Sequence, residues 1–136
     1  MDLAKLIIPS KEITTQFRNY DGFNIKVAYL TRDEIRDLTK RATTQKFSKR
    51  TRQPEEELDN DLFLDLYIDN VIKGWSGLKY EYLSKLIPID LSAIDDKSTE
   101  LDYTKNNARM LMKNCSELDA WIQDLQDDVE NFTKNS

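Results

Sequence analysis

The 136-residue chain contains no histidine, one cysteine, three glycines and three prolines. Without histidine it has no imidazole base, no Ser-His or Cys-His nucleophile pair and no ordinary zinc site. A single cysteine excludes an internal disulfide and a zinc site with several cysteine ligands. No apolar run approaches the roughly 20 residues of a membrane-spanning helix. We therefore expect a protein that is not an enzyme, holds no metal or cofactor and has no membrane partner.

Length and charge restrict the number of domains and the class of partner. A chain of this length is expected to form a single domain, residues 1–136, with a real core. Its net charge of −5 and isoelectric point near 4.8 argue against nucleic acid as the main partner. The opening "MDLAKLIIPSKE" has too short an apolar stretch for a signal peptide. We expect the protein in the cytoplasm.

The first 30 residues have the pattern of strands. Apolar side chains alternate in residues 23–30 and again in 13–17, with the turn dipeptide Asp21-Gly22 between them. At Thr31 the period changes, because "TRDE" fits a capping box and apolar residues follow at helical spacing. The sequence predicts a β-hairpin in region 1–30 and a helix that begins after Thr31 and ends near Ala42.

Residues 43–54 have no apolar period and are predicted to form an exposed basic loop. Its cations are Lys46, Lys49, Arg50 and Arg52. Such a loop could bind phosphates, but no second aromatic residue joins Phe47 to make a platform on which bases stack. A loop that faces solvent or a protein partner is the simpler interpretation.

The acidic stretch after Pro54 leads into a helix with two apolar sides. A wide apolar arc predicts burial, while Leu58, Leu62 and Leu66 form a second, narrow stripe within the charged arc. This stripe predicts a surface for a protein partner or for self-association. The alternative is that the C-terminal helix of the same chain packs there. The many carboxylates on this helix and on the last one are interpreted as solvated faces.

Two of the three glycines flank Trp75 in "VIKGWSGL". Gly74 falls where a helix would end, and glycine tolerates the left-handed conformation of a C-terminal cap. We expect a corner between two helices, residues 31–87 being helical apart from the basic loop. Trp75 is predicted to pack on the last helical turn or to anchor a partner.

After Pro88 the chain is predicted to be irregular over 88–103 and helical over 104–132. "SELDAWIQDLQDDVENF" has one apolar stripe and an S-x-x-D start, which predicts a single helix over 116–132. The expected fold class is therefore mainly α, a bundle of about five helices with a small N-terminal β-hairpin.

Three segments carry a family resemblance: "YLTRDEIRDLTKRATTQKF", "TRQPEEELDNDLFLDLYIDNVIKGWSGLKYEYLSKLIPIDLS" and "YTKNNARMLMKNCSELDAWIQDLQDDVENF". Together they resemble tail assembly chaperones of long-tailed, siphovirus-type bacteriophages and prophages, over roughly residues 22–132. The most telling piece is an acidic, apolar helix that leads into "VIKGWSGL" and then "LIPIDLS".

The resemblance implies a small, mostly helical factor without enzymatic activity. Such proteins bind the tape-measure protein and keep it soluble while the tail tube polymerises around it. They act in the cytoplasm of the host bacterium and are absent from the mature virion. In many phages a frameshifted longer form recruits tail tube subunits, which makes the major tail tube protein a second expected partner.

Two other functions remain open at this point. A minor tail or head-completion protein of a phage would persist in the purified particle, whereas a chaperone would not. A nucleic-acid-binding regulator would use the basic loop and would bind with strong salt dependence.

Overall fold

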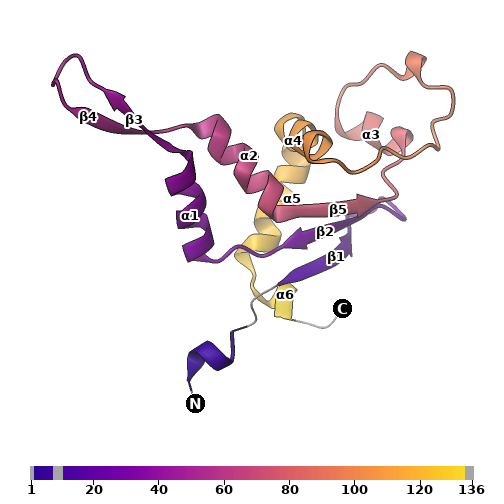
Figure 1. Cartoon of the computed structure of the whole chain (residues 1–136). Coiled ribbons are helices and arrows are strands. Elements are labelled where there is room, and N and C mark those ends of the chain that lie inside the picture. The colour runs from indigo at the N-terminus through magenta and orange to yellow at the C-terminus, as the bar shows by residue number, and fades with distance from the viewer. Residues whose placement is uncertain (1, 8–10, 134–136) are drawn as a thin grey trace.

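A computed structural model describes residues 2–7 and 11–133 of the chain. The described residues form, in chain order, η1 (Leu3–Lys5), β1 (Glu12–Gln16), β2 (Asn24–Ala28), α1 (Arg32–Ala42), β3 (Thr43–Phe47), β4 (Pro54–Leu58), α2 (Asn60–Val71), β5 (Ile72–Ser76), α3 (Tyr80–Leu86), η2 (Leu91–Ala93), α4 (Lys105–Asn114), α5 (Ser116–Asp127) and α6 (Glu130–Thr133). The strands belong to two separate sheets (Figure 1). The fold is mixed α/β, and the expected mainly α bundle with one small hairpin is wrong.

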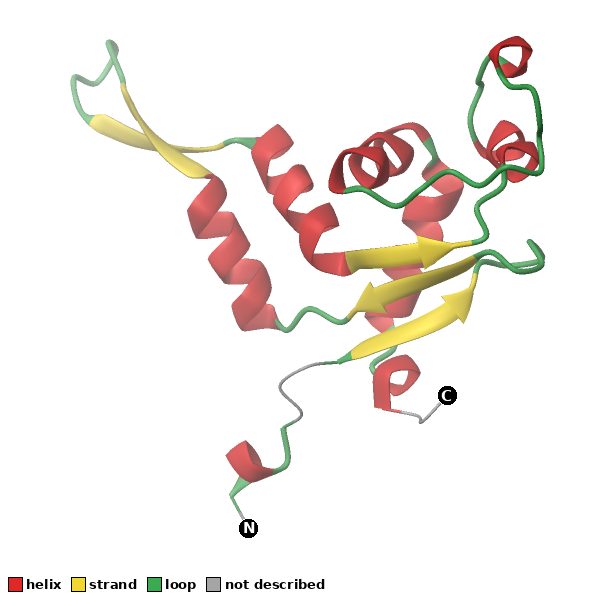
Figure 2. Cartoon of the chain, turned by 45° about the vertical axis from the view of Figure 1, so that its right-hand side comes forward, coloured by secondary structure: helices red, strands yellow, loops and turns green. Residues whose placement is uncertain are grey.

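The three-stranded sheet has the antiparallel order β1-β2-β5 (Figure 2). Its β1-β2 hairpin is confirmed, with Ile13 opposite Val27 and a turn that includes Gly22. The sequence prediction missed β5, which pairs with β2 and places Trp75 opposite Ile25. β2 is therefore the central strand, and Ile25 and Val27 on it are fully buried.

The predicted helical corner at Gly74 is wrong for the same reason. α2 ends at Val71 and the chain continues directly as β5, so Gly74 lies within a strand and does not have a positive φ. Gly77 is the glycine that the backbone requires, since its φ is +78°. A Cβ there would lie 1.9 Å from the carbonyl oxygen of Gly22. The hairpin turn and the chain after β5 thus cross in direct backbone contact.

The helices bury the remaining apolar stripes in one core. α5 runs behind the three-stranded sheet in Figure 1, and Trp121 on it packs edge-on against Phe17 with ring centroids 5.1 Å apart. Gln126 of α5 fixes the end of β2, because its side chain accepts from the Leu30 amide and donates to the Ala28 carbonyl. The core combines side chains from the three-stranded sheet and α2, α4 and α5 with single residues of α1, α3 and α6 and of the connecting loops.

The local helix signals are confirmed at the start of α1 and only partly at the C-terminus. Thr31 and Glu34 form both hydrogen bonds of a capping box. The helix expected over 116–132 is divided, because α5 ends at Asp127 and α6 follows as a short separate turn. Cys115 rather than Ser116 caps α5, its sulfur accepting from the Leu118 amide at 3.4 Å.

Candidate partner-binding surface

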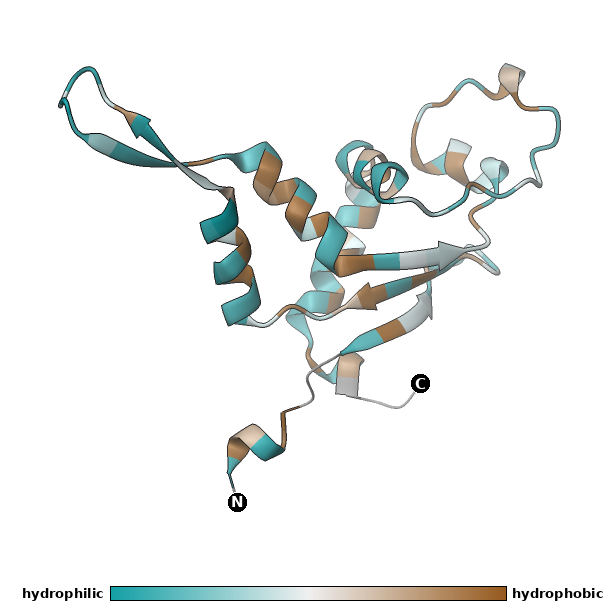
Figure 3. Cartoon of the chain, viewed as in Figure 1, coloured by the Kyte–Doolittle hydropathy of each residue, from teal (hydrophilic) through white to brown (hydrophobic). Residues whose placement is uncertain are grey.

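The segment predicted as a basic loop is a β-hairpin that stands away from the body of the protein. β3 and β4 pair antiparallel from Thr43 opposite Leu58 to Phe47 opposite Pro54. We call residues 43–58 the arm; it projects from the ends of α1 and α2 in both views (Figures 1 and 2). Nearly all of its side chains are exposed, and Figure 3 shows it as mostly hydrophilic. No helix or second sheet therefore covers either face of the arm among the described residues.

The two faces of the arm differ in chemistry. Directly opposite residues of an antiparallel pair share a face, and every second residue does too. One face carries Thr44, Lys46, Glu55 and Glu57, with Lys46 Nζ 2.9 Å from a Glu57 carboxylate oxygen. That hydrogen bond and the carboxylate charge raise the pKa of Lys46. The other face carries Phe47 and Leu58, which are 69% and 40% exposed.

The remaining predicted basic residues lie in the turn at the tip of the arm. Lys49, Arg50 and Arg52 are all exposed. Arg52 has a φ of +57°, and its amide donates to the Ser48 carbonyl at 2.8 Å, which closes the turn. Three cations of the predicted loop therefore lie together at an exposed end. The fourth, Lys46, lies on β3, where it pairs with Glu57.

The leucine stripe is divided between three environments. Leu58 ends β4 instead of opening the helix, because Asp59 caps α2 by accepting from the Leu62 amide at 3.0 Å. Leu62 begins the helical part and is 37% exposed. Leu66 is half-buried and packs against the core. Leu58 and Leu62 are thus the exposed members of the stripe, and both lie at the root of the arm.

The charged arc of α2 is covered by α4 and not by the C-terminal helix. Asp69 accepts from Arg109 Nε at 2.9 Å, and Lys113 Nζ lies 2.6 Å from Asp65. Both pairs are spaced by four residues on each helix, which places the two ion pairs one turn apart. Sequence reasoning noted the acidic residues but not the matching spacing of the basic ones.

Trp75 has an intramolecular role that the sequence did not reveal. Its indole nitrogen donates to the Leu101 carbonyl at 2.9 Å, and its ring meets Tyr103 edge-on at 5.2 Å between centroids. Tyr103 in turn donates to the Ile72 carbonyl at 2.9 Å. These contacts hold the connection between α3 and α4 against β5. The side chain remains half-buried, so part of it is also open to contact from outside.

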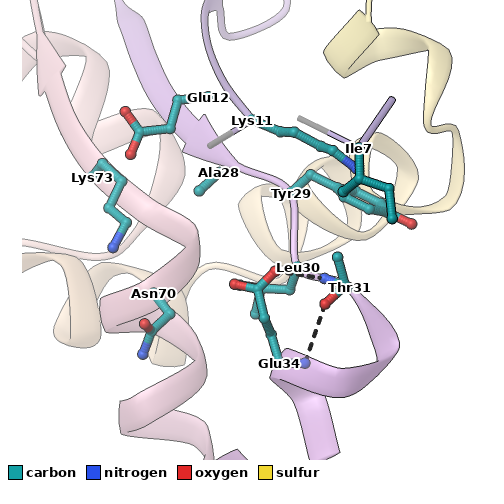
Figure 4. A pocket seen from close by; sticks show the side chains of 10 residues that line it. All are labelled: Ile7, Lys11, Glu12, Ala28, Tyr29, Leu30, Thr31, Glu34, Asn70 and Lys73. Carbon is teal, nitrogen blue, oxygen red and sulfur yellow. Dashed lines mark hydrogen bonds between the residues drawn. The ribbon is translucent and has the colours of Figure 1, made fainter. Parts of the chain in front are cut away.

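Two hollows have polar walls. One, of about 480 Å³, lies at the root of the arm between Lys46, Leu58 and Asp61. The other, of about 340 Å³, is lined by Lys11, Tyr29, Asn70 and Lys73 with the Thr31–Glu34 capping pair at its edge (Figure 4). Lys11 lies 5.2 Å from the centre of the Tyr29 ring.

The structure adds two observations about chemistry. Residues 2–7 and 11–133 contain no cluster of three carboxylate, histidine or cysteine groups placed to hold a metal ion. No helix in these ranges combines the length and the apolar character that crossing a membrane requires.

Sequence analysis considered Phe47 only as a base-stacking residue and missed the strand β3 that carries it, with the open edge of that strand. The signal was present in "TTQKF", which is rich in threonine and ends in an aromatic residue, as strands often do. The cations that surround this segment predicted an exposed basic loop instead. An acidic segment at the right distance to pair with it, "PEEEL", was assigned to the helix.

Comparison with known proteins identifies one family. Residues 28–136 match the model of the family described as YdaY prophage protein. The match begins at the end of β2 and spans the arm, α2, β5 and all of the C-terminal helices. Searches of curated proteins and of solved structures gave no match.

Proposed function

We propose that this chain, which belongs to the YdaY prophage protein family, is a phage tail assembly chaperone that binds the tape-measure protein. Membership of the family makes it a phage-related protein. In the proposed role it keeps the tape-measure protein soluble in the cytoplasm of the host while the tail tube polymerises, and it is absent from the mature virion. The major tail tube protein is a second proposed partner. No enzymatic step is part of this role.

The observation that carries the proposal is the open apolar surface at the root of the arm. Leu58 and Leu62 are 40% and 37% exposed, and Leu58 lines the hollow at the root of the arm. An apolar helix that needs protection from water can lay its anchor residues on exposed leucines of this kind. Covering leucine side chains with a partner stabilises the complex by about 25 cal/mol per Å² of apolar area removed from water.

The charged surroundings of this surface suit a protein that must keep its partner soluble. Glu57, Asp59 and Asp61 lie beside the two leucines and are all exposed. Such a rim stays hydrated when the apolar centre is covered, and rim charges contribute to orientation more than to affinity. The resemblance of the sequence to tail assembly chaperones supports the same role independently of this surface.

The test is co-expression with a tape-measure protein of a long-tailed phage. The wild-type chain should co-purify with it and raise its soluble fraction. The double variant Leu58→Glu, Leu62→Glu should lower co-purification at least tenfold, because two charges would enter an apolar contact without partners. Both residues are exposed in the free protein, so the variant should keep the wild-type circular dichroism spectrum.

A matched control uses Met110→Glu together with Val129→Glu. These residues are 54% and 44% exposed, on α4 and between α5 and α6. The control has the same change of charge and should bind as the wild type does. A wild-type chain that fails to bind the tape-measure protein would contradict the proposal. Stoichiometric recovery of the chain in purified virions, measured by mass spectrometry, would favour a minor tail or head-completion protein.

A further inference from the structure

The two outer edges of the arm are not equivalent. In the part of the chain that the structure describes, β3 and β4 pair only with each other, so each strand has an open edge. An open edge presents backbone groups on which another strand can pair, and proteins commonly guard it with charge or proline. β4 is guarded in this way, since it consists of Pro54, three consecutive glutamates and Leu58. β3 has one charged residue, Lys46.

The hydrogen bonds of the arm show which groups face outward on β3. The Asp59 amide donates to the Ala42 carbonyl, and the Ser48 amide donates to the Gln53 carbonyl, at 2.9 and 3.0 Å. Residues that bond inward alternate with residues that face outward. Thr44 and Lys46 therefore bond toward β4, and the backbones of Thr43, Gln45 and Phe47 face the open edge. The Thr43 amide is already used, because it donates to the Lys40 carbonyl.

We propose that two copies of this chain associate through the open edges of β3, forming a symmetric four-stranded sheet from two arms. The two β3 strands run antiparallel, with Gln45 opposite the second copy's Gln45 and Phe47 opposite the second copy's Thr43. Each Gln45 amide donates to the other Gln45 carbonyl, and each Phe47 amide donates to the other Thr43 carbonyl. The inference goes beyond the proposed function and does not depend on it.

The distribution of charge favours a second copy of the same chain as the partner of the β3 edge. In the symmetric register Lys46 lies opposite Thr44, and no two like charges face each other across the new pair. Lys46 also shares a row with the second copy's Glu57, two strands away, so that the row combines charges of opposite sign. The same symmetry applied to β4 would place Glu56 against Glu56 and Glu55 against Glu57. The sequence thus permits the symmetric pair on one edge and opposes it on the other.

The apolar face of the arm supports the same register. Phe47, 69% exposed in the free chain, would lie beside the second copy's Thr43 and toward its Leu58. An isolated two-stranded hairpin is marginally stable in water, and additional strands are the usual source of its stability. The arm also stands clear of the body, so an antiparallel pair would place the two bodies at opposite ends (Figure 1).

Sedimentation equilibrium with paired proline variants tests the proposal. The wild-type chain should show a concentration-dependent mass that approaches twice 16.0 kDa. Gln45→Pro removes an outward amide without touching the bonds to β4 and should weaken self-association at least tenfold. Glu56→Pro is the matched control, because Glu56 is the cross-strand partner of Gln45 and its amide faces the other edge. The control should associate as the wild type does.

Amide hydrogen exchange on the unmodified chain locates the contact directly. The amides of Gln45 and Phe47 should become protected as concentration rises, while the Glu56 amide should exchange equally fast at all concentrations. The proposal is overturned if the wild type stays monomeric, if Gln45→Pro associates normally, or if protection does not depend on concentration. If both proline variants dissociate, the exchange at Gln45 and Phe47 decides between the two edges.

Discussion

The two sheets of this protein are built on different principles. Central strand β2 of the three-stranded sheet has Ile25 and Val27 fully buried, and α5 covers the sheet from behind. The two-stranded arm has strands of the same length, yet β4 is exposed along its whole length. The first sheet is stabilised by burial of apolar area, whereas the arm is held by its own ladder of hydrogen bonds and by contacts such as Lys46 with Glu57.

This difference indicates that the three-stranded sheet determines the stability of the chain, whereas the arm is available for contacts with partners. Truncation of the buried residues of the three-stranded sheet should destabilise the whole chain, because they share one core with α2, α4 and α5. Substitutions in the arm should leave the core intact and change only what the arm contacts. Surfaces that bind partners are expected in such regions of low local stability. The three predictions below test this separation, beginning with the largest effect.

Gly77→Ala should be the most damaging single change near the three-stranded sheet. The added Cβ would lie 1.9 Å from the Gly22 carbonyl oxygen, and φ at this position is +78°. Backbone must move on both sides, so we expect a loss of about 4 kcal/mol or more in the free energy of unfolding. Urea denaturation followed by circular dichroism measures it.

The other two glycines are controls for this effect. Gly22 also has a positive φ, +82°, but its Cβ would meet nothing within 4 Å, so Gly22→Ala should cost only about 1 kcal/mol. At Gly74 the nearest atom to an added Cβ is the Lys26 Cβ at 4.0 Å, an ordinary contact. Gly74→Ala should therefore be neutral or slightly stabilising. Equal effects at all three positions would refute the close crossing of the chain at Gly77.

Ile25→Ala and Phe47→Ala compare the two sheets directly. Ile25 is fully buried, so its truncation should lower the free energy of unfolding by about 2–5 kcal/mol. Phe47 is larger but 69% exposed, and its truncation should change stability by no more than about 0.5 kcal/mol. Both measurements belong at low protein concentration, where the arms are unpaired. A large loss for Phe47→Ala in the monomer would mean that the arm is packed.

The smallest expected effect concerns pH. Burial raises the pKa of Tyr67, and the hydrogen bond from the Gln123 amide, 3.0 Å long, opposes that shift. A raised pKa in the folded state means that stability is full below the ordinary tyrosine pKa of about 10 and is lost as pH rises through the folded value. The absorbance titration at alkaline pH should lose a late-ionising tyrosine in Tyr67→Phe.

Gln123→Ala supplies the control for that titration. Removal of the donated hydrogen bond leaves the phenolate without support, so the pKa of Tyr67 should move further upward. A downward movement would show that Gln123 does not stabilise the ionised form. The arm tip contains no tyrosine, so the titration reports on the packed part of the molecule alone.

The sequence predicted those elements whose signal is local. Alternation of apolar residues identified β1 and β2, the "TRDE" box located the start of α1, and apolar stripes identified α2, α4 and most of α5. Of the leucine stripe, Leu58 and Leu62 are exposed, whereas Leu58 lies in β4 and not in the helix, and Leu66 packs against the core. Each of these signals depends on residues within a few positions of one another, and so does the physics behind it.

Only the tertiary structure decided the strands β3, β4 and β5 and the crossing of the chain at Gly77. "IKGWS" has no alternation that predicts a strand, and it becomes β5 because β2, some 50 residues earlier, offers an unpaired edge. "PEEEL" becomes a strand because β3 precedes it at hairpin distance, against its own weak preference for that structure. Gly77 is required because Gly22 lies against it and because the chain adopts a φ of +78° there. Pairing between distant segments is a property of the folded chain, and the sequence of either segment taken alone does not contain it.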